Sequence, residues 1–156
     1  MEKVDSIDLK MLTVLQKDGS ISQRDLAEQV GLSQNACWRR LQRLSASGII
    51  SGTRTTINLS ALGLDLVVFV MVRTRHHSKE WADQFRAHVE RLPEVTDFFR
   101  IGGDWDYLIK VTARGMAGYD AFYQKLITNF DLATVTGFFS MEAILQNRAM
   151  DLGKLK

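Results

Sequence analysis

The strongest constraint on the fold of this chain is a pair of helix signals that lie only a few residues apart. Ser22 opens a capping pattern that begins a helix, and Gly31 suits the left-handed position that ends one. Ser33 then caps a second amphipathic segment, which ends near Gly48. A short helix, a tight turn and a longer helix make up the helix-turn-helix arrangement, so residues 22–50 predict that motif.

The charge distribution around this motif is uneven, although the net charge of the chain is only +2. Residues 29–64 hold four arginines and no Asp or Glu, whereas residues 65–156 hold 12 basic and 12 acidic residues. A local basic surface is the electrostatic signature of nucleic-acid binding. A solvated helix face is the common alternative for a charge run, but the absence of acids over 36 residues favours double-stranded DNA as a partner.

The outer face of the second helix carries the side-chain types that contact DNA bases. With Cys37 on the inner face, Gln34, Asn35 and Arg39 lie early in the helix and offer donors and acceptors to base edges in the major groove. Other polar residues nearby suit phosphate contacts, which give affinity without sequence information. The predicted DNA-binding residues are Ser33, Gln34, Asn35, Trp38, Arg39, Arg40, Gln42, Arg43 and Arg54. Packing against the first helix or the wing is the favoured alternative for Trp38.

The segments on either side of the motif complete a winged helix-turn-helix domain. Asp5 and Asp8 suit the start of an amphipathic helix that ends at residues 17–20. The Thr-rich residues 49–59 alternate and predict either a small β-hairpin or an extended wing. We therefore expect the first domain to span residues 1–60.

Residues 61–156 predict a second domain with a different pattern. The expected order is βαββαβ, which is a ferredoxin-like unit with two helices on one face of an antiparallel sheet, and the chain as a whole is of the α+β class. The first strand is apolar on both faces, so the uncovered face favours burial in a dimer. The predicted strands are residues 64–75, 95–101, 106–113 and 133–145, and the predicted helices are residues 79–92 and 118–130.

The turn between the two middle strands holds a candidate ligand site. Asp104 and Asp106 could together anchor an ammonium group, and the amides around Gly102 and Gly103 could hold a carboxylate. A simple hairpin turn explains the same residues and is favoured by spacing alone.

Several function classes find no support in the sequence. The single cysteine, Cys37, suits a core position, forms no intrachain disulfide and agrees with a reducing cytoplasm. The sequence shows neither a signal peptide nor an apolar run long enough to span a membrane. His76, His77 and His88 lack metal-ligand spacing, and no nucleophile or nucleotide motif is present. We expect no cofactor, no metal and no enzyme activity.

The order and spacing of several motifs resemble the leucine-responsive regulatory protein (Lrp)/AsnC family of bacterial and archaeal transcription factors. The resemblance runs nearly end to end, and its most specific part is Gly-Asp-Trp-Asp-Tyr-Leu at residues 103–108. The other segments that carry it are residues 5–9, 15–19, 26–33, 37–44, 48–50 and 93–95.

This resemblance implies a regulator in which a RAM-type effector domain follows the DNA-binding domain. Such proteins are usually dimers that assemble into tetramers or octamers, and a small effector, commonly an amino acid, binds between effector domains. The resemblance assigns that effector to Gly103, Asp104, Asp106 and Tyr107. The family often carries Thr or Ser in the last strand, where this chain has two phenylalanines beside Ser140.

Three hypotheses therefore stand. The first is an amino-acid-responsive transcription regulator, and the second is a ligand-independent architectural DNA-binding protein whose second domain only oligomerises. The third is an enzyme that uses the ferredoxin-like half, which lacks a convergent catalytic set.

Overall fold

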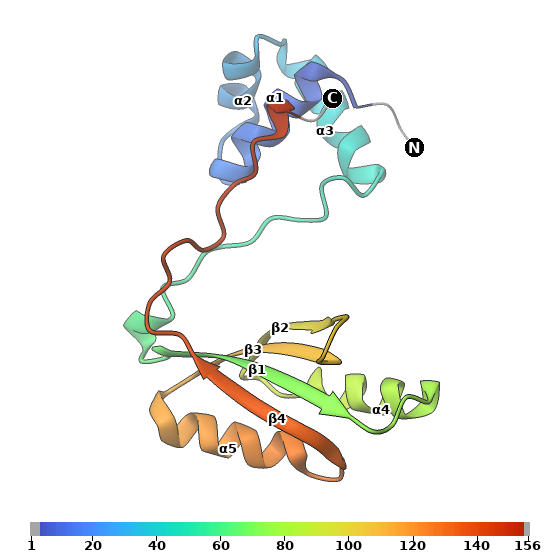
Figure 1. The fold of residues 1–156 in the computed structure, drawn as a ribbon. Coiled ribbons are helices and arrows are strands. Elements are labelled where there is room, and N and C mark those ends of the chain that lie inside the picture. Colours follow the sequence, from blue (N-terminus) through green and yellow to red (C-terminus); the bar gives the residue numbers. More distant parts are fainter. Residues whose placement is uncertain (1–3, 155–156) are drawn as a thin grey trace. The chain divides into compact units, whose positions relative to one another are not determined.

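The computed structural model describes residues 4–154, which form two compact units (Figure 1). The first unit contains the residues up to Thr56 together with those from Leu145 onward, and the second unit is Ile57–Ile144. The predicted division at residue 60 differs from this arrangement mainly at the C-terminus. The final residues belong to the first unit because they pack on its first helix.

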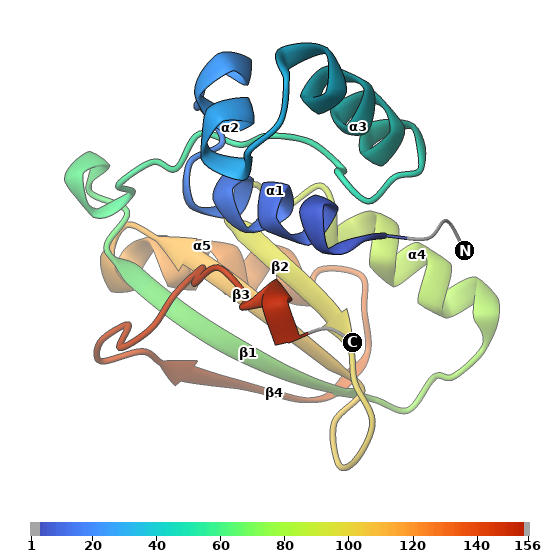
Figure 2. The same ribbon diagram turned by 90° about the horizontal axis from the view of Figure 1, so that it is seen from above.

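The first unit is built on three helices, α1 (Ser6–Lys17), α2 (Gln23–Val30) and α3 (Gln34–Ala46) (Figure 2). Each begins where a capping side chain satisfies a free backbone amide. The Asp5 carboxylate accepts from the Asp8 amide at 2.9 Å, the Ser22 hydroxyl from the Asp25 amide at 3.1 Å, and the Ser33 hydroxyl from the Ala36 amide at 3.3 Å. The predicted helix-turn-helix is confirmed.

The turn of this motif depends on Gly31, which has a φ of 71° in the left-handed region. The amide of Leu32 donates to the carbonyl of Ala27 at 2.9 Å and closes the end of α2. The buried core beneath the turn is Met11, Leu26, Ala27 and Cys37. Cys37 therefore occupies the core position that its helix face predicts.

Residues 51–58 show no strand, so the hairpin alternative for the wing is wrong. Their side chains are all exposed. A two-stranded hairpin is at best marginally stable in water unless it packs on a further strand or helix, and this segment has no such cover. The extended alternative is the one that the structure supports.

The second unit has the predicted βαββαβ order. Its four strands form one antiparallel sheet in the order β2-β3-β1-β4, and α4 and α5 cover one face of it (Figure 1). This is the ferredoxin-like arrangement. The elements are β1 (Leu66–Thr74), α4 (Lys79–Val89), β2 (Val95–Arg100), β3 (Tyr107–Ala113), α5 (Gly115–Ile127) and β4 (Leu132–Phe139).

Alternation along the central strands places one side of the sheet against the two helices. In β1, Val68, Val70 and Val72 are fully buried. Phe85 of α4 and Phe122 of α5 pack over them and are fully buried as well. This face is the main hydrophobic core of the chain.

Several predicted boundaries in this unit are wrong, including the ends of α4 and α5, which come three residues before residues 92 and 130. The last strand ends at Phe139 instead of residue 145, because its partner β1 begins at Leu66. The amide of Ser140 still donates to the Val67 carbonyl at 2.9 Å, and beyond this point there is no neighbouring strand to pair with. Helix α5 also begins three residues earlier than the sequence predicts, at Gly115.

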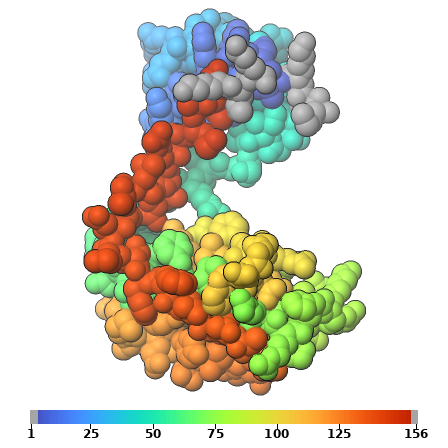
Figure 3. Space-filling view, viewed as in Figure 1, coloured from blue at the N-terminus to red at the C-terminus, as the bar shows by residue number. Residues whose placement is uncertain are grey.

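The C-terminal segment returns to the first unit (Figure 3). A short 3-10 helix, η2 (Leu152–Lys154), lies against α1. The Gln16 side chain bridges both backbone groups of Met150. It accepts from the amide at 3.0 Å and donates to the carbonyl at 3.4 Å. The sequence analysis did not predict this contact.

Candidate nucleic-acid interface and ligand cavity

The exposed face of α3 carries the residues that the sequence predicts to read bases. Gln34, Asn35, Arg39 and Gln42 are all exposed, while Cys37 on the opposite face is fully buried. The predicted orientation of the helix is therefore confirmed, although their contacts with bases stay a prediction. The side-chain amide of Gln23, in α2, donates to the Gln34 carbonyl at 3.1 Å and ties the start of α3 to its neighbour.

Three further predicted DNA-binding residues lie at the start of α3, within it and after it. Ser33 uses its hydroxyl to cap α3. Trp38 is 51% exposed, so part of its side chain can reach DNA while the remainder is covered, and the packing alternative stays a prediction. Arg54 is exposed in the extended segment after α3.

Arg40 and Arg43 have intramolecular partners that the sequence analysis missed. Arg40 lies 2.7 Å from the Asp5 carboxylate and 2.8 Å from that of Asp8, and Arg43 also pairs with Asp8. The Asp8 side chain is fully buried, whereas the two arginines are partly exposed. Acids from α1 therefore neutralise part of the basic run in α3, although that run itself contains no acid.

Hydrogen bonds keep these carboxylates ionised. The Asp8 amide, and then the Arg40 guanidinium, lower the pKa of Asp5 to about 2. Burial alone would raise the pKa of Asp8, but the Asp5 amide and the side chains of Arg40 and Arg43 outweigh it and lower that pKa. The same pairs raise the pKa of Arg40. The network is thus fully charged near neutral pH and links α3 to α1.

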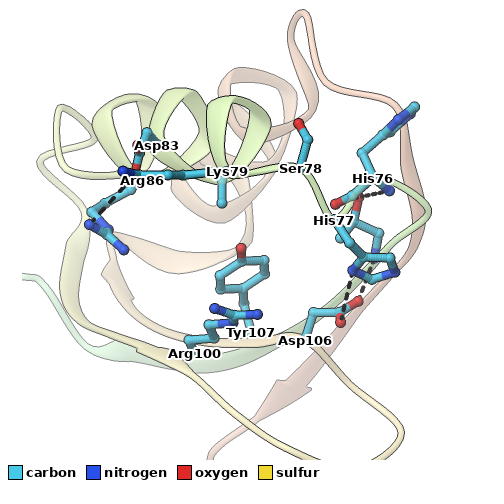
Figure 4. A pocket seen from close by; sticks show the side chains of 11 residues that line it. His76, His77, Ser78, Lys79, Asp83, Arg86, Arg100, Asp106 and Tyr107 are labelled. Carbon is cyan, nitrogen blue, oxygen red and sulfur yellow. Dashed lines mark hydrogen bonds and ion pairs between the residues drawn. The ribbon is translucent and has the colours of Figure 1, made fainter.

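The second unit contains a cavity of about 360 Å³ at one end of its sheet (Figure 4). The segment between β1 and α4 supplies His76 and His77, and α4 supplies Lys79 and Arg86. Arg100 comes from the end of β2. The remaining lining residues are Thr74, Ser78, Ala82, Asp83, Asp106 and Tyr107.

Two of the four predicted effector residues line this cavity, and two do not. Asp106 and Tyr107 line it, whereas Gly103 and Asp104 do not. The Asp106 carboxylate accepts from the Thr74 amide at 2.8 Å, and Tyr107 is 7% exposed. Asp104 contributes its backbone carbonyl, which accepts from Arg73 Nε at 2.6 Å. Asp104 and Asp106 thus have different surroundings.

Gly103 allows this turn to form, because its φ of 105° is one that other residues rarely adopt. Arg73 also lies over the ring of Trp105, 5.2 Å from its centroid. The turn is therefore held against β1 by one side chain that makes a hydrogen bond and a cation–π contact.

The sequence analysis missed the basic residues of the cavity. It noted the two histidines only as lacking metal spacing, and it assigned no role to Lys79, Arg86 or Arg100. Lys79 and Arg86 lie in α4 and Arg100 lies in β2, so the three meet only through the packing of α4 over the sheet. A helix face with Lys79 and Arg86 seven residues apart was the one available signal, and a solvated surface explains it equally well.

The sheet face away from α4 and α5 exposes large apolar side chains. Phe69, Phe99 and Phe138 are 37%, 52% and 54% exposed, and the register places Phe69 directly opposite Phe138. Such a patch is unusual for an isolated soluble domain and typical of an interface.

Two features are absent from residues 4–154. Within that range no helix has the length and apolarity needed to cross a membrane. Nor do three or more His, Cys, Asp or Glu side chains of this described part gather in a way that could hold a metal ion.

The fold and its two sites define a class, namely DNA-binding transcription regulators that carry a separate ligand-binding domain. Residues 4–51 match the family described as "Winged helix-turn-helix DNA-binding", and residues 67–150 match "Lrp/AsnC ligand binding domain". The chain belongs to the Lrp/AsnC family of transcription regulators.

Relatives of similar length support this assignment. The chain is 42% identical over 142 residues to the DNA-binding transcriptional activator DecR of Escherichia coli, covering 90% of this chain and 93% of that one. It is 39% identical over 152 residues to the glutamate uptake regulatory protein of Zymomonas mobilis, covering 97% and 93%.

Solved structures agree with the fold. An AsnC family regulator from Agrobacterium tumefaciens has a TM-score of 0.88 at 38% identity, covering 92% of this chain and 94% of that one. A transcriptional regulator from Neisseria meningitidis, solved as its L-Met complex, has a TM-score of 0.92 at 28% identity, covering 99% and 100%.

Proposed function

We propose that this regulator reads its operator with the exposed face of α3, in which Gln34, Asn35 and Arg39 contact bases. The observation that carries this proposal is the exposure of these side chains opposite the buried Cys37. Trp38 and Gln42 flank them. The residues assigned to phosphates are Ser33, Arg40, Arg43 and Arg54.

The first test is DNA selection followed by titration. Genomic fragments that the purified protein retains would define the operator, and fluorescence anisotropy would then measure its affinity. Arg39→Ala removes a bidentate base contact and should lower specific affinity by about 1–3 kcal/mol while leaving assembly unchanged. Arg91→Ala, an exposed arginine of the second unit, is the matched charge control. Unchanged operator affinity in Arg39→Ala would refute the assignment.

Phosphate contacts have a separate signature. Arg54→Ala should weaken binding to all sequences about equally and reduce the salt slope by about one unit. A change in sequence preference would show that Arg54 reads bases instead.

The functional assembly is a homodimer that joins through the exposed sheet face and forms tetramers or octamers. One helix-turn-helix offers a small reading surface, so pairs of α3 about one DNA turn apart give a stronger complex. The apolar patch of Phe69, Phe99 and Phe138 supports this interface. Phe138→Asp should yield monomers in sedimentation, and an unchanged distribution would place the interface elsewhere.

The second unit senses a small effector, and an amino acid is the best candidate. The cavity beside Asp106 and Tyr107 supports this choice over a ligand-independent architectural protein. The effector changes assembly or DNA affinity only if it binds two states differently. Calorimetry of the full protein against the twenty amino acids tests it, and the absence of heat for all would favour the ligand-independent alternative.

The protein acts in the cytoplasm, where its DNA target lies. It acts by binding, and no catalytic step is assigned to it, because its relatives are named as transcription regulators.

A further inference from the structure

We propose that the cavity under α4 selects a small ligand with two carboxylates, and that an acidic α-amino acid fits it best. This inference rests on the proposed function in one respect, namely that the second unit binds the effector. It goes further in naming the class of ligand and the groups that distinguish it.

The lining of the cavity argues against an apolar ligand. Ala82 is the sole aliphatic side chain among its eleven lining residues. Most small-molecule sites bury apolar groups against apolar walls. A leucine or methionine side chain would find almost no such surface here.

Positive charge dominates the rim. Lys79, Arg86 and Arg100 outnumber the two lining carboxylates, Asp83 and Asp106. Arg86 lies 3.8 Å from Asp83, which is too long for a hydrogen bond, so its donors remain available to a ligand. Guanidinium groups bind carboxylates with paired, charge-assisted hydrogen bonds.

The charged side chains are not spread evenly over the lining of the cavity. Figure 4 shows the Tyr107 hydroxyl pointing toward α4, with Arg86 on one side of it and Asp106 and His77 on the other. The Asp106 carboxylate accepts from the Thr74 amide, and its other oxygen lies 3.9 Å from His77 Nδ1. It therefore keeps acceptor capacity for an ammonium group.

This polarity matches a ligand with an ammonium group near Asp106 and carboxylates toward the arginines. The volume of about 360 Å³ lies within the range of ordinary ligand sites. A phosphate ion would satisfy the arginines but would leave Asp106 facing a second negative charge.

The test is calorimetry on the full protein with L-glutamate, L-aspartate, glutarate, L-methionine and inorganic phosphate. We expect one of the two acidic amino acids to bind most tightly. Glutarate lacks the ammonium group and should bind about tenfold more weakly. Arg100→Gln and Arg86→Gln should each lower the affinity for the acidic amino acid by about tenfold or more. Both positions are exposed, so folding is preserved. Arg91→Gln, just beyond α4, should leave binding unchanged.

The outcomes separate this inference from the proposed function. Tighter binding of methionine than of both acidic amino acids, with the arginine variants unaffected, would overturn the inference and leave an effector response intact. Phosphate binding as tight as that of glutamate would overturn it in favour of a general anion site. Equal affinity for glutarate and glutamate would overturn the role of Asp106. Absence of heat for every amino acid would overturn both this inference and the effector response.

Discussion

The two units of this chain hold their helices in place by different means. Among the described residues, the second unit has a cluster of thirteen buried hydrophobic side chains, several of them aromatic, whereas the corresponding cluster of the first unit has four. The first unit adds a charged network in which the buried Asp8 joins Arg40 and Arg43. A small unit buries a small share of its surface, so it gains more from such pairs.

The comparison also bears on function. A helix that presents its outer face to DNA can be anchored only from its other side, and α3 is anchored by Arg40, which directly follows the proposed reading residue Arg39, and by Arg43 one turn later. In the second unit, packing against the sheet positions α4 and thereby the arginine that it contributes to the cavity.

The largest effect is expected in the second unit for Phe85→Ala. The ring is fully buried and lies 5.1 Å from Trp81 and 5.2 Å from Tyr107, centroid to centroid. Its loss should destabilise the unit by about 3–5 kcal/mol, measured by denaturant unfolding. Hydrogen exchange in α1 to α3 should remain unchanged, and equal loss of protection there would contradict independent stabilisation of the units.

A smaller loss is expected in the first unit for Asp8→Ala. This change removes the shared partner of Arg40 and Arg43, and we expect a loss of about 2–3 kcal/mol in thermal unfolding, because both arginines can reach water afterwards. Asp5→Ala removes a more exposed partner and a helix cap, for which about 1 kcal/mol is typical. A larger effect of Asp5→Ala would show that capping matters more than the buried pair.

Acid should loosen the first unit before the second. The folded pKa of Asp5, about 2, lies below its ordinary value of 3.8, and that of Asp8 is also lowered. Their contribution is therefore fully present above pH 3.8 and is lost as the pH falls through about 2. Amide NMR signals of α1 and α3 should broaden or shift over this range.

The second unit offers the internal reference for that titration. There the side chain of Lys125 lies 2.6 Å from Glu94 and lowers its pKa against the opposing effect of burial. Because this pair lies beside a large core, signals of β1 and β3 should persist to lower pH. Loss of the α1 and α3 signals at the same pH as the β1 and β3 signals would argue against a special role for the Asp8 network.

The smallest expected effect is a gain in the stability of the second unit. Gly118→Ala, inside α5, should stabilise the second unit by about 0.5–1 kcal/mol, since alanine favours helix and the new Cβ would meet Ala113 at an ordinary 3.5 Å. Gly137→Ala is the matched contrast, because its Cβ would clash with the Tyr119 hydroxyl in the core. That change should cost about 1–3 kcal/mol.

Local features of the fold were predictable from the sequence. Ser22 and Ser33 accept from amides three residues further on, and the Gly31 amide donates to carbonyls of α2, so the bounds of α2 and α3 follow from capping chemistry. The alternation in β1 likewise predicts which of its faces is buried. These signals need no knowledge of the tertiary structure.

Features that depend on distant partners were not predictable. Asp8 and Arg40 are 32 residues apart in sequence, so the count of charges near α3 overestimated the positive charge that α3 presents. The end of β4 depends on where β1 begins, and the cavity joins residues of α4, β2 and β3. In each case the missing information was which segments become neighbours in space.

The bridge between Gln16 and Met150 has a consequence for biosynthesis. These residues are 134 positions apart, yet both belong to the first unit. During translation the three helices leave the ribosome before the second unit, while the segment that packs on α1 emerges only after that unit. That surface of α1 is therefore open to chaperones or to other chains until the second unit has been made.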